Sequence, residues 1–143
     1  MKTSRCLAFA VAVLAVSSNL HAADPLTKLA SIHDFAFGGV GFTGITSKGE
    51  VAFREVMERK TAAADFLALL DSGNPQAKCY ALVGLRLLDP TAFGTQVKRF
   101  EKDKTKVSTM AGCMISEQLM LSVVANISAG RYDEQAKRKD VRR

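Results

Sequence analysis

The sequence predicts an all-α fold, either a short α-solenoid or a helical bundle, with a Gly/Phe-rich loop near its N-terminus. Three observations support this prediction. Apolar residues recur at helical spacing, Asn-Pro and Asp-Pro pairs mark helix starts, and a helix-pair pattern recurs after about 30 residues. The chain has 143 residues, which is enough for one domain with a hydrophobic core.

The N-terminal segment, residues 1–22, has the three zones of a secretory signal peptide. Lys2 and Arg5 give a positive start, an apolar run too short to span a bilayer follows, and a polar stretch ends at Ala22. Cleavage near Ala22 removes both cations, so the formal charge of +6 becomes +4. We therefore predict a secreted or periplasmic protein that is not transmembrane after cleavage. An uncleaved anchor is the alternative.

The mature chain is expected to begin with a short helix, because Asp24 and Pro25 have the N-cap and first-turn pattern. The segment Phe35–Glu50 is rich in glycine and phenylalanine, which predicts a packed loop or a short hairpin laid on the helical body. Ser47 has capping-box spacing to Glu50 and predicts the start of the next helix.

Two further helices are expected on either side of a Gly-Asn-Pro turn. Thr61 is the predicted cap of the first helix, and Gly73 is predicted to close it in a left-handed conformation. Asn74 is the predicted cap of the second helix, which stops before Pro90. Asp89 and Pro90 then repeat the start signal for a further helix.

The last apolar segment, residues 107–130, is also expected to be helical, with a possible break at Gly112. The domain boundaries that follow are a helical domain over residues 23–130 and a basic tail over residues 131–143. The tail has almost no apolar content, which predicts disorder.

An internal repeat supports the stacked arrangement. Residues 74–84 align with residues 104–114, and in both copies an apolar helix, a polar turn and a second apolar segment follow one another. The stretch LALLDSGNPQAKCYALVGLRLLDP resembles a HEAT-like repeat, and the resemblance covers about Thr61–Ile127. It implies a short α-solenoid, whose exposed faces bind partners. An unrelated helical bundle is the alternative fold.

Two cysteines, Cys79 and Cys113, remain after cleavage, in a compartment where disulfides persist. A Cys79–Cys113 disulfide is the prediction, with two separate buried thiols as the alternative. The spacing of the two cysteines, with no histidine near either, is not that of a metal site.

Catalytic, cofactor and metal sites are not predicted. His33 is the only histidine of the mature chain, so Ser-His-Asp and multi-histidine zinc sites are hard to assemble. Gly39, Gly41 and Gly44 match the dinucleotide fingerprint, but no helix opens at the third glycine and no βαβ pattern follows. We interpret this match as a coincidence, and an enzyme is not favoured.

Two basic regions are possible contact surfaces. Their members are Lys98, Arg99 and Lys102 in one region, and Lys137, Arg138 and Lys139 in the other. The simpler interpretation is that these side chains are solvated and bind nothing. The more specific interpretation is that the basic tail contacts an anionic surface. Nucleic acid is not expected, because no aromatic stacking platform accompanies these charges.

The sequence therefore favours an exported, non-catalytic binding or structural module that contacts another envelope protein. The alternative is a small ligand-binding protein or enzyme that uses the Phe35–Glu50 loop.

Overall fold

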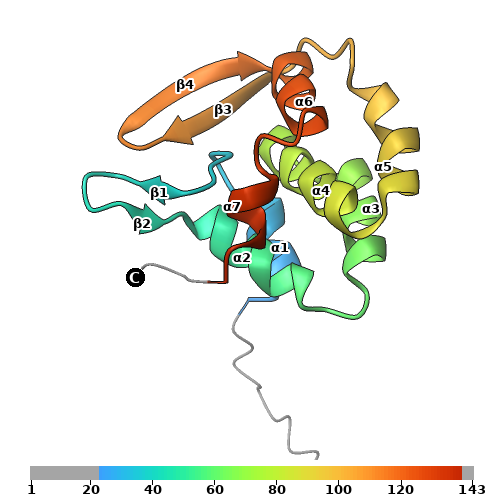
Figure 1. Ribbon diagram of the computed structural model, residues 1–143, viewed down its shortest axis with the longest axis horizontal. Coiled ribbons are helices and arrows are strands. Elements are labelled where there is room, and N and C mark those ends of the chain that lie inside the picture. Colours follow the sequence, from blue (N-terminus) through green and yellow to red (C-terminus); the bar gives the residue numbers. More distant parts are fainter. Residues whose placement is uncertain (1–22, 140–143) are drawn as a thin grey trace, which may run out of the picture.

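The computed structural model describes residues 23–139, in which helices and two small antiparallel sheets share one core (Figure 1). The helices are α1 (Pro25–Ala30), α2 (Lys48–Met57), α3 (Ala62–Ser72), α4 (Pro75–Leu88), α5 (Pro90–Gln96), the 3₁₀ helix η1 (Val97–Arg99), α6 (Met120–Ser128) and α7 (Asp133–Lys137). The strands are β1 (Gly39–Val40), β2 (Ile45–Thr46), β3 (Lys106–Ala111) and β4 (Met114–Leu119). The predicted signal peptide lies outside the described residues, as do residues 140–143.

The all-α prediction is wrong, because residues 23–139 are 56% helical and 15% strand, with two small antiparallel sheets. The error lies mainly in residues 106–119, which form the β3–β4 hairpin instead of a helix. Val107 and Thr109 alternate with more exposed neighbours and face the core, which is the two-residue period of a strand. Gly112 adopts φ +54° in the two-residue turn, so the predicted helix break is a hairpin turn.

The helix pair α3–α4 has the structure that was predicted for the first copy of the repeat. The second copy does not fold as the first does, because its second apolar segment is β3. The resemblance to HEAT-like repeats therefore stays a prediction.

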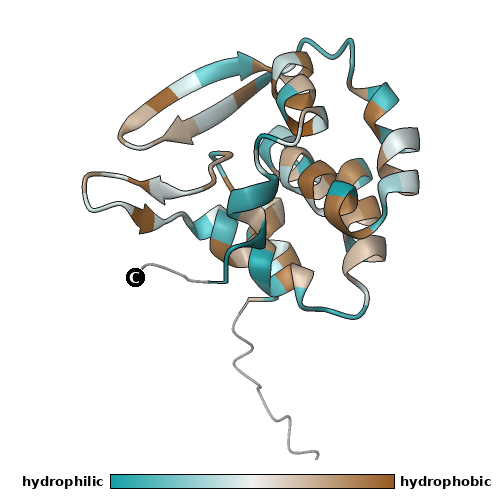
Figure 2. Cartoon of the chain, in the orientation of Figure 1, coloured by the Kyte–Doolittle hydropathy of each residue, from teal (hydrophilic) through white to brown (hydrophobic). Residues whose placement is uncertain are grey.

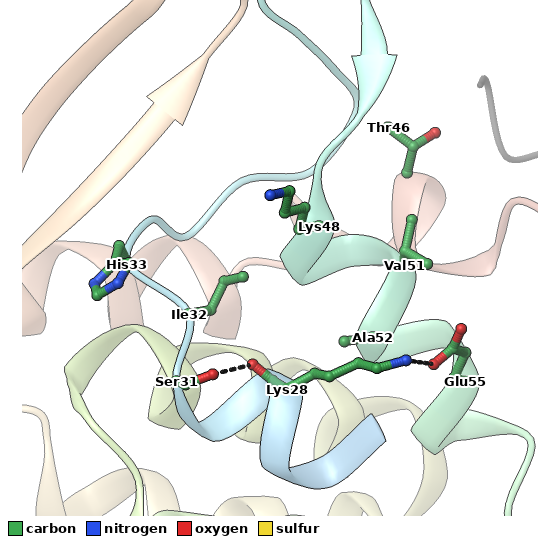
Figure 3. A pocket seen from close by; sticks show the side chains of 9 residues that line it. All are labelled: Lys28, Ser31, Ile32, His33, Thr46, Lys48, Val51, Ala52 and Glu55. Carbon is green, nitrogen blue, oxygen red and sulfur yellow. Dashed lines mark hydrogen bonds and ion pairs between the residues drawn. The ribbon is translucent and has the colours of Figure 1, made fainter. Parts of the chain in front are cut away.

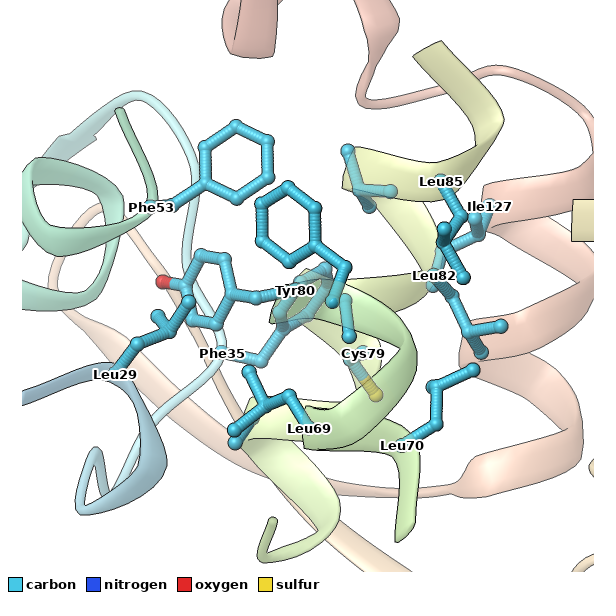
Figure 4. Close-up of a cluster of buried hydrophobic side chains, with 14 of the residues drawn as sticks. Leu29, Phe35, Phe53, Leu69, Leu70, Cys79, Tyr80, Leu82, Leu85 and Ile127 are labelled. Atoms are coloured by element: carbon cyan, nitrogen blue, oxygen red, sulfur yellow. The ribbon is translucent and has the colours of Figure 1, made fainter. Parts of the chain in front are cut away.

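Helix α4 is the centre of the core and packs against α3, α5 and α6 (Figures 1 and 4). The largest buried side chains on α4 are Tyr80, Leu82, Val83 and Leu85. Gly84 allows α3 to approach, since a Cβ at this position would lie 2.3 Å from the Phe66 ring. Apolar colouring follows the inner faces of these helices and also marks parts of both hairpins (Figure 2).

Most of the predicted helix starts are confirmed by side-chain caps. The residues whose side chains accept a backbone N–H at a helix start are Asp24, Ser47, Asn74 and Asp89. Thr61 makes no such bond. The predicted left-handed conformation of Gly73 is wrong, because its φ is −77°. Glycine is still required there, since a Cβ would lie 2.6 Å from the carbonyl oxygen of Leu69.

The C-terminal segment is ordered where it meets the core. Residues 133–137, which the sequence placed in the disordered tail, form α7. Asp133 pairs with Arg86 of α4 at 3.1 Å, and the half-buried Tyr132 packs edge-on against Phe35. An ion pair and an aromatic contact therefore dock this segment on the core.

The two hairpins lie side by side at one end of the molecule (Figure 1). Phe35 forms a parallel bridge with Thr109, and Val40 forms another with Gly112. The amide of Gly41 donates to the carbonyl of Gly112 at 2.9 Å. The segment that enters the β1–β2 hairpin is thus held along one edge of β3.

Candidate functional site

The segment before β1 is held in place by the hydroxyl of Tyr80. This hydroxyl donates to the carbonyl oxygen of Ala36 at 2.7 Å and accepts from the Ala36 amide at 3.0 Å. Ser47 donates to the same carbonyl at 3.1 Å. Gly49 lets α2 approach, because a Cβ there would lie 2.4 Å from the Tyr80 hydroxyl. Burial is the main cause that raises the pKa of Tyr80, so its hydroxyl stays protonated at neutral pH.

The glycine-rich loop is held by a buried ion pair on α2. Glu50 is only 2% exposed, accepts from the Gly38 amide at 2.8 Å, and pairs with Arg54 one helical turn later. Arg54 also donates to the carbonyl of Gln135 in α7 at 3.3 Å. One carboxylate and one guanidinium thus connect α2, the loop and the C-terminal helix.

A groove lies between α1, the segment that follows it and α2 (Figure 3). We call it the α1–α2 groove; its volume is about 430 Å³. The apolar part of its lining is Ile32, Val51 and Ala52. A second cavity of about 260 Å³ adjoins it and shares Ile32, His33, Thr46 and Lys48 with it. Much of this lining comes from the Phe35–Glu50 loop and the residues just before it.

The ionisable side chains of the α1–α2 groove divide into an ion pair and two groups that have no partner within residues 23–139. Lys28 and Glu55 form an ion pair at 3.5 Å along one side (Figure 3). His33 and Lys48 lie on the other side, and within residues 23–139 neither has a hydrogen-bond or ion-pair partner. Because the pair is neutral as a whole, Lys48 leaves the groove with a net positive charge.

A second candidate site is an apolar surface on the two hairpins. We call it the hairpin surface and define it as Phe42, Ile45, Met114, Ile115 and Leu119. Among the described residues, one other large apolar side chain, Leu88, is also exposed. Phe42 is 99% exposed and Met114 76%, which is unusual for such side chains. Several exposed apolar side chains on two neighbouring hairpins favour a candidate interaction site, although Met114 and Ile115, as consecutive residues of β4, point to opposite faces of its hairpin.

The outer edge of β4 adds backbone groups to this surface. Phe35 occupies the other edge of the hairpin, because its amide donates to Ser108 and its carbonyl accepts from Met110. The backbone groups of Ser108 and Met110 therefore point away from β4. Ser108 faces Glu117 in the β3–β4 ladder, and Met110 faces Ile115. Because these are non-hydrogen-bonded pairs, the backbone N–H and C=O groups of Glu117 and Ile115 also point outward, away from β3. Within the described chain, no strand pairs with this edge.

The predicted Cys79–Cys113 disulfide is not formed in the structure, and both thiols are free. Cys79 is buried in α4, where its Sγ lies 3.6 Å from the Met120 sulfur. Cys113 is exposed in the β3–β4 turn, because the segment that carries it is a hairpin and not a helix beside α4. Burial is the main cause that raises the pKa of Cys79, so this thiol is not a nucleophile at neutral pH.

The two predicted basic regions lie on different elements. Lys98 and Arg99 are in η1, and Arg99 pairs with Asp71 at 2.8 Å. Lys102 follows in the loop after η1. The members of the other region are Lys137 at the end of α7, and Arg138 and Lys139 just beyond it. Arg138 pairs with Glu134 at 3.2 Å, whereas Lys137 and Lys139 have no ion-pair partner within residues 23–139.

The glycines of the dinucleotide-like pattern build the β1–β2 hairpin. Gly41 and Gly44 have φ of +70° and +63° in its turn, and Gly39 leaves room for the backbone of Gly44. The helix of a nucleotide-binding turn does not begin at the third glycine, since α2 starts at Lys48. The glycines therefore have a structural explanation.

Comparisons with family models, curated proteins and solved structures find no match for this chain. In the part of the chain that the structure describes, no cluster of three or more His, Cys, Asp and Glu residues is arranged to hold a metal ion. No helix within residues 23–139 is long and apolar enough to cross a membrane. The candidate sites consequently rest on geometry.

Sequence reasoning named the Phe35–Glu50 loop as an alternative ligand site, but it identified neither the full lining of the α1–α2 groove nor the hairpin surface. The α1–α2 groove combines residues from α1 to α2 that meet only through tertiary packing. The hairpin that carries the second site had a weak local signal, since the β-branched residues Val107 and Thr109 precede a Gly-Cys turn. The helical interpretation of residues 107–130 hid this signal.

Proposed function

We propose that this protein is an exported, non-catalytic binding module that contacts another envelope protein through its hairpin surface. The observation that carries the proposal is the gathering of exposed apolar side chains on two adjacent hairpins. A globular core normally takes up such side chains, so their exposure at one end favours a partner that covers them.

The open edge of β4 indicates how the partner binds. An extended segment of the partner would add a strand there and bond to the free backbone groups of Ile115 and Glu117. Ile115 and Leu119 point to the same face of the hairpin, because residues two or four apart share a face. The matching segment should therefore carry apolar residues at alternate positions.

Site-specific photocrosslinking in the exporting cell tests this proposal. A photoreactive phenylalanine analogue replaces Ile115, and the control places it at Thr95, an exposed position on α5. We expect one dominant protein adduct from the first position and none from the second. The same experiment in a Phe42→Ser, Met114→Ser background should lower the adduct yield at least about five-fold, since interface anchors dominate affinity.

Equal adducts from positions 115 and 95 would contradict the proposal, as would an adduct that the double substitution leaves unchanged. Both serine substitutions replace exposed side chains, so the stability of the fold should change by less than about 0.5 kcal/mol. The mass of the exported protein, read in the same samples, tests the predicted cleavage near Ala22.

Contact of the basic tail with an anionic surface is the second candidate function. Lys137 and Lys139 favour it, because both are exposed and neither has an ion-pair partner among the described residues. Deletion of the tail would also remove α7, which is tied to Arg86 and Arg54. The sharper test is Lys137→Ser with Lys139→Ser, which should weaken binding to anionic lipid vesicles. Unchanged vesicle binding would exclude the tail as the contact.

A further inference from the structure

The α1–α2 groove has the size and lining of a small-molecule site. Its volume of about 430 Å³ lies within the range of about 300–1,000 Å³ that is typical of ligand pockets. Ile32, Val51 and Ala52 provide apolar surface along its floor (Figure 3). Apolar lining with a few polar groups is the usual composition of such sites.

The charged side chains of the groove favour a ligand with a negative charge. Lys48 and His33 offer hydrogen-bond donors that have no partner within the described chain. Lys28 is already paired with Glu55 across the far side. An anionic group beside Lys48 would be stabilised, and a cation there would be repelled.

The adjoining cavity is the poorer place for an anion. Asp34 lines it, and the carboxylate of Asp34 already accepts a hydrogen bond from Ser108 at 2.5 Å. This negative charge disfavours a second carboxylate in the same cavity. The anionic head group is therefore best placed at the shared rim, with the apolar body of the ligand in the larger cavity.

We propose that the α1–α2 groove binds an amphipathic monocarboxylate, with its head group at Lys48 and His33 and a medium-length apolar chain over Ile32 and Val51. Burial of this apolar chain away from water supplies most of the affinity. The head group contributes orientation and the preference for negative charge. This inference is independent of the hairpin surface, which uses other residues.

Heteronuclear NMR of the full chain, titrated with octanoate well below its micelle concentration, tests the proposal. We expect saturable shifts confined to the amides of the groove, among them Ile32, Thr46 and Val51. Octylamine has the same alkyl chain with the opposite charge, and it should bind at least about five-fold more weakly, because even an exposed charge contact contributes up to about 1 kcal/mol.

Matched substitutions locate the head group and the chain. Lys48→Gln should weaken octanoate binding about five-fold, whereas Lys60→Gln, an exposed lysine outside the groove, should leave it unchanged. Val51→Asp places a negative charge on the floor and should abolish the shifts. An acidic residue near the start of α2 suits the helix dipole, so this variant should fold.

Three results would overturn the proposal. They are the absence of saturable shifts in the groove, equal binding of octanoate and octylamine, and equal affinities of the Lys48→Gln and Lys60→Gln variants. None of them bears on crosslinking at Ile115, so the two proposals fail separately.

Discussion

The hydroxyl of Tyr80 joins the helical core to the segment that builds the α1–α2 groove. It bonds to both backbone groups of Ala36, and its ring lies among Phe35, Phe37 and Phe53. Tyr80 therefore holds this segment in two ways, through the packing of its ring and through a hydroxyl that both donates and accepts a hydrogen bond.

Tyr80→Phe should destabilise the fold by about 1–3 kcal/mol. The substitution keeps the ring but leaves the buried amide of Ala36 without the acceptor it has in the native protein. Urea denaturation followed by circular dichroism measures the loss. An unchanged midpoint would show that the hydroxyl bonds are not needed to hold the segment.

Gly84 and Gly94 form a matched pair of helical glycines with opposite expected effects. A Cβ at Gly84 would meet the Phe66 ring at 2.3 Å, so Gly84→Ala should cost about 1–3 kcal/mol through overpacking. A Cβ added at Gly94 on α5 would meet no atom within 4 Å beyond its own helix backbone and chain neighbours, and Gly94→Ala should stabilise by up to about 1 kcal/mol. Thermal melts of both variants compare the two effects, and equal shifts would contradict the close packing of α3 and α4.

At the scale of elements, the Glu50–Arg54 pair connects pieces that are distant in sequence. Glu50 fixes the glycine-rich loop through the Gly38 amide, and Arg54 reaches the Gln135 carbonyl in α7. Both side chains are largely buried, at 3% and 13% exposure. Removal of one partner would leave the other charge buried with less compensation.

Glu50→Gln should therefore destabilise the protein by about 3–5 kcal/mol, the range for breaking a buried ion pair. Glu58→Gln, at the exposed C-terminal cap of the same helix, is the control and should change stability by less than about 0.5 kcal/mol. Chemical denaturation compares the two variants. Similar losses of stability in both variants would mean that the Glu50–Arg54 pair does not hold these elements together.

The sequence predicts the helices well where the start signals are local. Asn74-Pro75 and Asp89-Pro90 set the starts of α4 and α5 through bonds within one helical turn. The β3–β4 hairpin was missed because apolar residues in 107–119 also fit a helical period, and the apparent repeat favoured helix. The Phe35–Glu50 loop was an alternative ligand site, but no local pattern marks the α1–α2 groove itself, because tertiary packing brings its lining together from α1, the segment after it and α2.

At the scale of the whole molecule, buried ionisable groups set the alkaline limit of stability. Burial is the main cause that raises the pKa of Cys79 from 9.0, and burial also raises the pKa values of Tyr80 and Tyr132 from 10.0. Above pH 9 the unfolded chain loses these protons while the folded chain keeps them. The unfolded state then binds fewer protons, so stability falls as the pH rises.

We expect the free energy of unfolding to be insensitive to these groups below about pH 9 and to fall above it. Each raised group adds a slope of up to about 1.4 kcal/mol per pH unit. Urea midpoints measured from pH 8 to pH 11 test this, and Cys79→Ala should delay the fall to about pH 10. The same onset in both proteins would show that Cys79 does not contribute.

The two thiols should differ sharply in reactivity. Cys113 is exposed and should be alkylated rapidly in the native protein, whereas Cys79 is buried and should react only after unfolding. Peptide mapping by mass spectrometry after a short iodoacetamide pulse distinguishes the two sites. If both thiols resist alkylation until a reductant is added, the protein contains the Cys79–Cys113 disulfide that the structure lacks.

The bond between Ala36 and Tyr80 spans 44 residues, and the bond between Asp34 and Ser108 spans 74 residues. Helices α3 and α4, by contrast, are neighbours joined by a short turn. Because closing a long loop costs more chain entropy than closing a short one, we expect local helix pairs to form early and these distant bonds to form late. We therefore expect the α1–α2 groove and the junction of the two hairpins to be completed last as the chain folds, so that both proposed binding surfaces exist only after that final step.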